Sequence, residues 1–313
     1  MNIVFFGTSE FAMPALKALL ESRHKVLALV TQPDRKRGRN LKLSPPPTKV
    51  LALERNIPVY QPLDASSYEA AEHLRKVNAD LFVVISFGQI LKKEILSLPR
   101  LYCLNVHGAL LPKYRGAAPT NWAIINGEEK SGVTVIKMNE KMDEGDVILA
   151  RGTKIDAEDT NITLSEELSE LGASALLEAI EMIEKGKADF KPQDHLKATY
   201  APKLTKKDGL IDWDMPAARI HNRVRGLIPW PSAYTHYEGK ILKVLQTEIL
   251  TQLVSRDAKT GQVVDIVKNE GIIVHTGSGD LTIKYLQLEG KKVLDADAFV
   301  RGHQIPKGYI FSK

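Results

Sequence analysis

The sequence contains a single cysteine, Cys103, among 313 residues. One thiol excludes an internal disulfide and a zinc cluster built from cysteines, and it fits a reducing compartment. The first residues, Met-Asn-Ile-Val-Phe-Phe-Gly, lack the basic start of a secretory signal, and their apolar run ends at Gly7. No apolar run approaches the roughly 20 residues of a membrane-spanning helix. We therefore expect a cytoplasmic protein without a membrane partner.

The glycine fingerprint of dinucleotide-binding proteins is also missing. The apolar run at 2–6 ends in Gly7-Thr8-Ser9, which supplies one glycine before the next helical pattern. The fingerprint needs three glycines, because the backbone must approach a pyrophosphate closely. The opening of the chain therefore gives little support to a nicotinamide cofactor.

What the chain does contain is a regular alternation of apolar runs and helical patterns. With 43% hydrophobic and 26% charged residues, it has the composition of a soluble globular protein with room for about two domains. The alternation predicts an α/β fold whose first domain is a Rossmann-like, doubly wound and mostly parallel sheet. We expect strands at 2–6, 25–31, 58–60, 80–86, 101–106 and 133–138, and helices at 11–20, 49–55, 68–77 and 120–125.

A second, smaller domain is expected after a polar stretch that begins near Gly186. Thr163-Leu-Ser-Glu166 has the spacing of a capping box and predicts the start of a long helix that closes the first domain. We divide the chain into a first domain at 1–186, a linker at 187–206 and a barrel-like, OB-like carboxyl-terminal domain at 207–313. The elements expected in the last domain are a helix at 217–225 and strands at 241–245, 262–267, 272–275 and 281–286.

The net charge of +5 is concentrated in one segment. Residues 31–50 contain one acid, Asp34, and a positive excess equal to that of the whole chain. The basic residues are Arg35, Lys36, Arg37, Arg39, Lys42 and Lys49. From the break at Gln32-Pro33-Asp34, through Gly38, to Pro45-Pro46-Pro47, the segment predicts an exposed loop that is neither helix nor strand. Such a loop attracts a polyanion such as RNA through phosphate neutralisation, and a merely solvated loop is the alternative.

Polar groups that can carry chemistry follow the apolar run 101–106. Asn105 and His107 are two residues apart, so on an extended chain both point to the same side. Gly, Pro and charged residues follow, as expected where a buried strand ends in a loop. Ligands of open α/β sheets bind at the carboxyl ends of the strands. The stretch predicts a site, and a buried structural histidine beside a turn-forming asparagine is the alternative.

Three acids lie within four positions in Met142-Asp-Glu-Gly-Asp-Val-Ile148. One of these carboxylates could orient His107 and stabilise its charge, as an acid does in hydrolytic triads. A metal-binding loop is a second interpretation, but the spacing is too short for an EF-hand and no histidine is close. Ordinary turn acids remain a third interpretation.

These residues resemble the methionyl-tRNA formyltransferase family, one of the folate-dependent formyltransferases. The resemblance covers nearly the whole chain, and its blocks are Phe6-Gly-Thr8 with Glu10-Phe11, Thr31-Gln-Pro-Asp-Arg35, Asn105-Val-His-Gly through Leu110-Leu-Pro-Lys-Tyr-Arg-Gly-Ala-Ala-Pro119, and Trp230-Pro-Ser-Ala233. The third block, with the later Gly132-Val-Thr and Met142-Asp-Glu-Gly-Asp146, is shared across folate-dependent formyltransferases. The resemblance implies transfer of the formyl group of 10-formyltetrahydrofolate to the amino group of methionyl initiator tRNA, which serves translation initiation.

The resemblance also implies roles for particular residues and for partners. The catalytic Asn, His and Asp of the family fall on Asn105, His107 and Asp143. The folate-contacting loop falls on Ala109, Leu110, Leu111 and Pro112, where the family usually has serine in place of Ala109. The tRNA-binding residues fall on Arg35, Lys36, Arg37, Arg39 and Lys42, and Arg39 occupies the position of an arginine that reaches the acceptor stem. Initiator tRNA and the folate co-substrate are the expected partners of a monomeric protein without a metal, whose carboxyl-terminal domain binds tRNA.

Formyl transfer needs a neutral attacking amine, a stabilised tetrahedral oxyanion and a proton for the leaving nitrogen. His107 can accept or relay a proton near neutral pH, Asn105 can donate to the oxyanion, and Asp143 can fix the imidazole. Cys103, two residues before Asn105, raises the alternative of a covalent thiol intermediate. Its place in an apolar strand favours a buried hydrophobe instead, and hence direct transfer.

Three other functions fit part of the same pattern. A formyltransferase acting on another amine would share the central block, and a formyl-folate hydrolase would share the folate site. A non-catalytic RNA-binding protein would use the sheet as a scaffold only. The basic segment and the second domain favour an RNA substrate over a small amine, and the Asn105, His107 and Asp143 set favours an enzyme.

Overall fold

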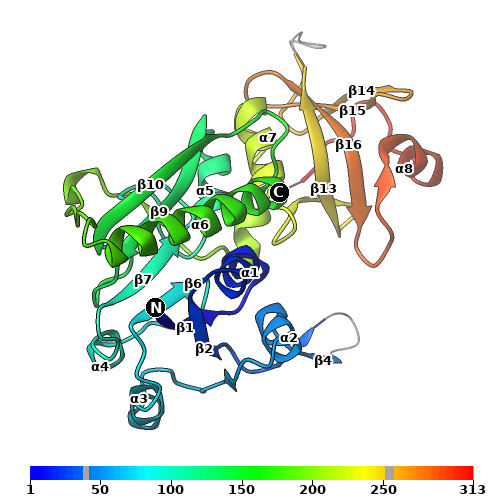
Figure 1. Ribbon diagram of the computed structural model, residues 1–313. Helices are drawn as coiled ribbons and strands as arrows, with labels where there is room; N and C mark the ends of the chain where they lie inside the picture. Colours follow the sequence, from blue (N-terminus) through cyan, green and yellow to red (C-terminus); the bar gives the residue numbers. More distant parts are fainter. Residues whose placement is uncertain (38–41, 251–256, 313) are drawn as a thin grey trace. The chain divides into compact units, whose positions relative to one another are not determined.

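The computed structural model describes residues 1–37, 42–250 and 257–312. The chain packs into two compact units that are not continuous in sequence (Figure 1). The first unit comprises residues 1–119, 130–154 and 165–202, and the second comprises residues 120–129, 155–164 and 203–313. The division at 1–186, 187–206 and 207–313 remains a prediction. In the structure, the short segments 120–129 and 155–164 pack with the second unit.

The first unit is built on a mixed sheet of seven strands in the order β10-β9-β7-β6-β1-β2-β5. The bounds are β1 (Asn2–Gly7), β2 (Lys25–Val30), β5 (Val59–Tyr60), β6 (Leu81–Ile85), β7 (Tyr102–His107), β9 (Lys130–Lys137) and β10 (Asp146–Lys154). The first five of these strands run parallel, whereas β9 is antiparallel to β7 and β10 is antiparallel to β9. The predicted α/β class with a mostly parallel sheet is confirmed.

Helices alternate with these strands along the chain, and most of them lie where the periodicity predicted a helix. They are α1 (Met13–Glu21), α2 (Pro47–Glu54), α3 (Tyr68–Arg75), α4 (Lys93–Leu96), α5 (Pro119–Ile125) and the long α6 (Asn161–Glu184), with a short 3-10 helix η1 (Glu10–Ala12). Helix α4 was not predicted. Gly172 of α6 packs on β7 and β9, because a Cβ there would lie 3.0 Å from the Val106 side chain and 3.7 Å from that of Val133. The absence of a side chain lets the helix approach the strand that carries Asn105 and His107.

The start of α6 corrects one prediction. The helix begins at Asn161, two residues before the predicted cap at Thr163. Thr160 and Thr163 exchange hydrogen bonds instead, since the Thr160 N–H donates to Thr163 Oγ1 at 3.0 Å and the Thr163 N–H to Thr160 Oγ1 at 3.3 Å. Both Thr160-to-Thr163 and Thr163-to-Glu166 have capping-box spacing, and the sequence alone did not separate them.

The basic segment corrects a second prediction, that it forms neither helix nor strand. Strands β3 (Arg35–Arg37) and β4 (Lys42–Ser44) pair antiparallel as a hairpin. Backbone hydrogen bonds make this pairing, so it needs no apolar side chains. Asp34 forms an ion pair with Lys49 at 2.8 Å, and therefore does not offset the charges of the hairpin.

The second unit contains an antiparallel sheet in the order β12-β13-β16-β15-β14, with β17 paired to β16. Its elements are the 3-10 helix η3 (Lys206–Gly209), α7 (Ala217–Gly226), β12 (Ala233–Tyr237), β13 (Lys240–Ile249), β14 (Val263–Val267), β15 (Gly271–His275), β16 (Asp280–Leu288), β17 (Leu294–Asp295) and α8 (Ala296–Gly302). The 3-10 helix η2 (His195–Lys197) belongs to the first unit. The predicted carboxyl-terminal β-rich domain is confirmed. Residues 308–312 bond to Val263 beside one edge and to His236 at the other, which joins the two edges as in a barrel.

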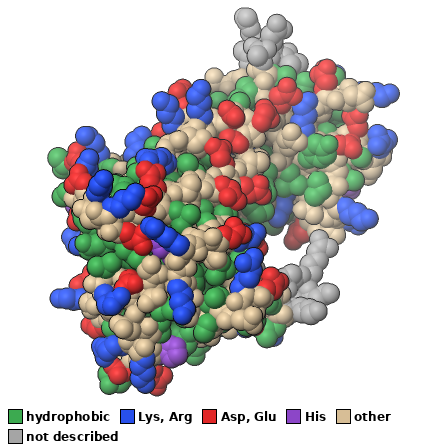
Figure 2. Space-filling model, in the orientation of Figure 1, with side chains coloured by type: hydrophobic (Ala, Val, Ile, Leu, Met, Phe, Trp, Pro, Cys, Tyr) green, Lys and Arg blue, Asp and Glu red, His purple; other side chains and the backbone are tan. Residues whose placement is uncertain are grey.

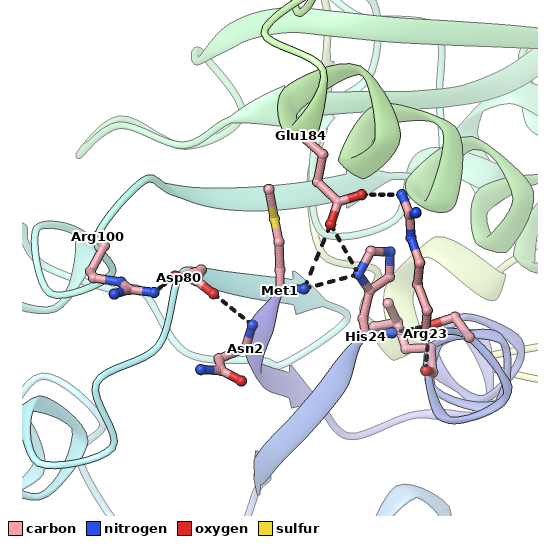
Figure 3. Close-up of polar contacts among 9 residues, drawn as sticks. Met1, Asn2, Arg23, His24, Asp80, Arg100 and Glu184 are labelled. Atoms are coloured by element: carbon pink, nitrogen blue, oxygen red, sulfur yellow. Dashed lines mark hydrogen bonds and ion pairs between the residues drawn. The ribbon is translucent and has the colours of Figure 1, made fainter.

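A cluster of charges ties the end of α6 to the sheet of the first unit (Figure 3). The Glu184 carboxylate pairs with Arg23 and lies 3.6 Å from both the Met1 amino group and His24 Nδ1. The Met1 amino group lies 3.3 Å from His24 Nδ1. Burial lowers the pKa of His24, although Glu184 opposes the shift. The neutral ring can therefore accept a hydrogen bond from the amine.

On the face drawn in Figure 2, lysine and arginine side chains are interspersed with aspartate and glutamate. No broad area of one charge is seen among the described residues on that face. Within residues 1–37, 42–250 and 257–312, no helix combines the length and apolarity required to cross a bilayer.

Candidate active site

Strand β7 places Asn105 and His107 at the carboxyl edge of the sheet. The His107 ring is 6% exposed, and its Nε2 lies 2.8 Å from the Tyr114 carbonyl oxygen. A carbonyl oxygen only accepts, so Nε2 carries the hydrogen of the neutral ring. The other nitrogen, Nδ1, lies 3.6 Å from Oδ1 of Asp143. The ring is thus held by a backbone oxygen on one side and faces a carboxylate on the other.

Asp143 meets three groups through its two carboxylate oxygens. Oδ2 accepts a hydrogen bond of 2.8 Å from the Gly116 N–H, and Oδ1 lies 3.4 Å from Asn105 Nδ2 and near His107. The structure therefore brings the three predicted residues Asn105, His107 and Asp143 together. Asp143 adopts a left-handed backbone conformation with φ of 54°. Aspartate is among the few residues that tolerate this region, and such backbone is concentrated at functional sites.

The loop that carries Tyr114 and Gly116 is held by the segment expected to be a linker. Strand β8 (Arg115–Gly116) pairs parallel with β11 (Tyr200–Ala201), and Thr199 Oγ1 accepts from the Tyr114 N–H at 2.9 Å. Gly116 has φ of 124°, and a Cβ there would lie 2.6 Å from the Ala201 carbonyl oxygen. Glycine is therefore required where the loop turns toward Asp143.

A buried polar cluster lies behind these two loops, and sequence reasoning missed it. Arg115 is 2% exposed and its guanidinium lies 3.2 Å from Oε1 of Glu144. It also donates to Gln193 Oε1 at 2.8 and 3.2 Å and lies 3.1 Å from His195 Nδ1. Of the three acids near position 143, one therefore faces His107 and the next neutralises a buried cation. The only sequence signal for this cluster was the arginine within the block 105–119.

The loop Ala109–Pro112 is fixed against strand β9. Thr134 Oγ1 donates to the Ala109 carbonyl at 2.7 Å and accepts from the Leu111 N–H at 3.0 Å. Leu110 packs where a Cβ on Gly132 would lie only 2.6 Å from it. Two backbone groups of the loop are thus already used within the protein, and the serine that the family usually has is replaced by a buried alanine.

Cys103 on β7 is buried in the hydrophobic core. It belongs to a cluster of buried side chains that includes Phe82 and Val84, and its Sγ lies 3.5 Å from Met138 Sδ. Burial raises the pKa of the Cys103 thiol. The thiolate needed for nucleophilic catalysis is therefore strongly disfavoured.

The predicted tRNA-binding residues are only partly described. Arg35 and Lys36 are exposed on β3, and Arg35 donates to Gln32 Oε1 at 2.9 Å. Arg37 and Lys42 belong to the paired strands, and Arg39 lies outside the described residues. Across the described part of the chain, no group of three or more His, Cys, Asp or Glu side chains is arranged to hold a metal ion.

Family models match this chain over both of its parts. The formyl transferase model matches residues 1–180, and the model of the formyl transferase carboxyl-terminal domain matches residues 203–304. The chain belongs to the formyl transferase family, whose formyl donor is formyl-tetrahydrofolate. The class defined by the fold and the site is thus a group-transfer enzyme of one-carbon chemistry.

Full-length relatives show which members of the family this chain resembles over its whole length. The chain is 45% identical to the methionyl-tRNA formyltransferase of Citrifermentans bemidjiense, over 100% of this chain and 97% of the relative. It is 44% identical to that of Clostridioides difficile, over 99% of each chain. The chain therefore belongs with the methionyl-tRNA formyltransferases.

Solved structures share the fold at lower sequence identity. The sugar 3N-formyl transferase WlaRD matches with a TM-score of 0.68 and 19% identity, over 93% of this chain and 99% of that one. HypX from Aquifex aeolicus, solved in complex with tetrahydrofolic acid, matches with a TM-score of 0.66 and 20% identity, over 100% of this chain and 51% of that one. At such identities the likeness establishes the fold alone.

Proposed function

We propose that this protein transfers the formyl group of 10-formyltetrahydrofolate to the free amino group of methionyl initiator tRNA. The observation that carries the proposal is the convergence of Asn105, His107 and Asp143 at the carboxyl edge of the sheet. Full-length methionyl-tRNA formyltransferases at 42–45% identity support the choice of acceptor. An enzyme that acts on charged tRNA would work in the cytoplasm, and we propose that it acts as a monomer without a metal.

Asn105, His107 and Asp143 would each have a separate role in the reaction. Among the described residues, Asn105 Nδ2 donates to Asp143 Oδ1 over a long distance of 3.4 Å, so its amide can donate to the formyl oxygen as negative charge develops there. His107 would accept the proton of the amine at Nδ1, because Nε2 is held by the Tyr114 carbonyl. The charged ring would then direct one N–H at Tyr114 and the other at the Asp143 carboxylate. As the bond between the formyl carbon and the folate nitrogen breaks, the Nδ1 proton would pass to that nitrogen, so that tetrahydrofolate leaves and the ring is neutral again.

We propose that Ala109, Leu110, Leu111 and Pro112 form the wall against which the folate lies. Thr134 holds this loop from behind, so its shape is fixed before any ligand arrives. The fixed wall and the amide of Asn105 fit a flat ligand whose formyl oxygen accepts one hydrogen bond. The loop would contribute contact area rather than a side-chain hydrogen bond at position 109.

We assign the tRNA-binding role to Arg35, Lys36, Arg37, Arg39 and Lys42 of the basic segment, and to the second unit. The one acid of the segment, Asp34, is neutralised by Lys49, which leaves the hairpin strongly positive. Each phosphate that the protein neutralises releases counterions, so binding should weaken steeply with salt.

The test of the acceptor is a formylation assay with purified protein, 10-formyltetrahydrofolate and one of several amines. We expect a blocked amino terminus on methionyl initiator tRNA, and no reaction with free methionine or an amino sugar nucleotide. Formate release without any acceptor would indicate a hydrolase, and equal rates on a small amine would contradict the tRNA assignment.

The test of the RNA surface is the salt dependence of tRNA binding. The double variant Arg35→Gln, Lys36→Gln should lower the slope of log K against log salt by about 0.7–0.9 for each phosphate that these side chains neutralise in the parent. Lys76→Gln is the matched control, because Lys76 is an exposed lysine at the carboxyl end of α3, outside the basic hairpin. An unchanged slope in the double variant would remove the hairpin from the interface.

A further inference from the structure

A buried carboxamide joins the two loops of the site from the segment that follows α6. Gln193 is 7% exposed. Its Nε2 donates to the carbonyl oxygens of Asp143 and Gly145, both at 2.8 Å, and its Oε1 accepts from the Arg115 guanidinium at 2.8 and 3.2 Å. The two donor sites and the acceptor of this amide are therefore satisfied in one arrangement.

The direction of the amide is fixed by its partners. Arg115 can only donate, so the oxygen of Gln193 must face it and the nitrogen must face the two carbonyls. Those carbonyls flank Glu144, whose carboxylate pairs with the same arginine. The turn 143–145 is thus held at three successive residues, through the backbone carbonyls of Asp143 and Gly145 and through the side chain of Glu144.

The consequence for the reaction concerns the position of one carboxylate. Asp143 has left-handed backbone, and from this conformation of the turn its side chain contacts Gly116, Asn105 and His107. A residue keeps a rarely populated backbone conformation only where the surrounding contacts stabilise it. Gln193 supplies two of the hydrogen bonds that do so.

We infer that Gln193 is a positioning residue for formyl transfer, which acts by holding the Asp143 turn against Asn105 and His107. The inference rests on the proposed function. A displacement of a catalytic group by 1 Å can cost about a hundredfold in rate. We therefore expect Gln193→Ala to lower kcat by roughly 10- to 100-fold, with KM for either substrate changed by less than about twofold.

Two further variants separate this role from simpler ones. Gln193→Glu retains an acceptor for Arg115 but loses both donors to the turn, so it should lose as much activity as Gln193→Ala. Retention of activity by the glutamate variant would reduce Gln193 to a partner of Arg115. Val26→Ala, in the buried part of β2, is the control for lost stability and should keep the kcat of the parent at a temperature where both are folded.

A double-variant cycle tests whether Gln193 acts through Asp143. In the Asp143→Asn background, Gln193→Ala should cause less than about a threefold further loss, because the group it positions is already disabled. The pH profile of Gln193→Ala should also move toward that of Asp143→Asn. If Gln193→Ala lowers the rate by the same factor in the Asp143→Asn background as in the parent, or if its pH profile stays like that of the parent, the inference is overturned.

One measurement does not depend on activity. Amide hydrogen exchange at Gly116, whose N–H donates to Asp143 in the intact turn, should be faster in Gln193→Ala than in the parent and unchanged in Val26→Ala. Unchanged exchange in Gln193→Ala would contradict the positioning role. If the parent formylates no tRNA, the proposed function fails, and the exchange result still decides whether Gln193 holds the turn.

Discussion

Asn105 offers the sharpest quantitative test of the site. Removing one preorganised donor to an oxyanion typically costs about 3 kcal/mol, or roughly a hundredfold in rate. Asn105→Ala should therefore lower kcat by about 10²–10³-fold while KM for the folate changes little. Asn105→Asp has nearly the same shape, but it places a second carboxylate about 3.4 Å from that of Asp143. At an effective dielectric constant of 20, two such charges repel by about 5 kcal/mol.

The two variants should therefore separate with pH. At pH 8 the aspartate variant should be less active than the alanine variant, because both carboxylates are charged and the donor is gone. As the pH falls, the pair can share one proton, and the aspartate variant should recover relative to the alanine variant. Single-turnover formylation rates between pH 6 and 8 measure this ratio.

Asn139→Asp is the control, because it adds the same charge at an exposed position on the turn between β9 and β10. It should remain close to the parent throughout. A ratio that does not vary with pH, or an Asn105→Ala variant within tenfold of the parent, would refute the assigned role of Asn105.

Three further outcomes follow from the structure. Cys103→Ala should keep most of the activity, because the thiol is buried in the core and burial raises its pKa; a loss as large as that of His107→Ala would instead indicate a covalent intermediate. Burial lowers the pKa of His24 and of His221 below 6.5, so the unfolded chain binds more protons than the folded one as the pH falls below that value, and stability should decrease there. Between pH 7.5 and pH 5.5 the urea midpoint should decrease less in His24→Gln and in His221→Gln than in the parent. If both variants lose as much stability as the parent, these two rings are not the cause. Gly145→Ala should lower both the melting temperature and kcat, because its Cβ would lie 1.9 Å from the Lys137 carbonyl oxygen and displace the turn of Asp143, whereas Gly302→Ala, where a Cβ has open space, should leave both unchanged.

Local sequence pattern predicted the parts of the site that lie on one element. Alternation along β7 placed Asn105 and His107 on one side, and the sheet edge followed from the order of strands and helices. Pattern alone did not choose among Asp143, Glu144 and Asp146, because the choice depends on the left-handed backbone at Asp143 and on the buried charge of Arg115. The family resemblance supplied Asp143, and the structure shows what the neighbouring Glu144 contacts.

The parts that were missed depend on contacts between distant segments. Gln193 and Thr199 lie in a polar stretch with two prolines nearby, which has the composition of a linker, and only their pairing with residues 114–145 reveals another role. The pairing of β3 with β4 was missed because these short strands carry basic residues and pair through backbone groups. Amino-acid composition reflects the preferences of side chains, whereas these features depend on contacts with segments that are distant in the sequence.

The division of the chain into discontinuous units limits how it can be dissected. The polypeptide passes from one unit to the other five times, since the second unit takes 120–129 and 155–164 as well as everything after 202. Asn121 donates to the Gly226 carbonyl, and Arg225 donates to the carbonyls of Asp156 and Asp159. A fragment starting at Lys203 would leave these groups on α7 without their acceptors and donors. A chimaera that exchanges the carboxyl-terminal module between relatives must therefore transplant three pieces of sequence together.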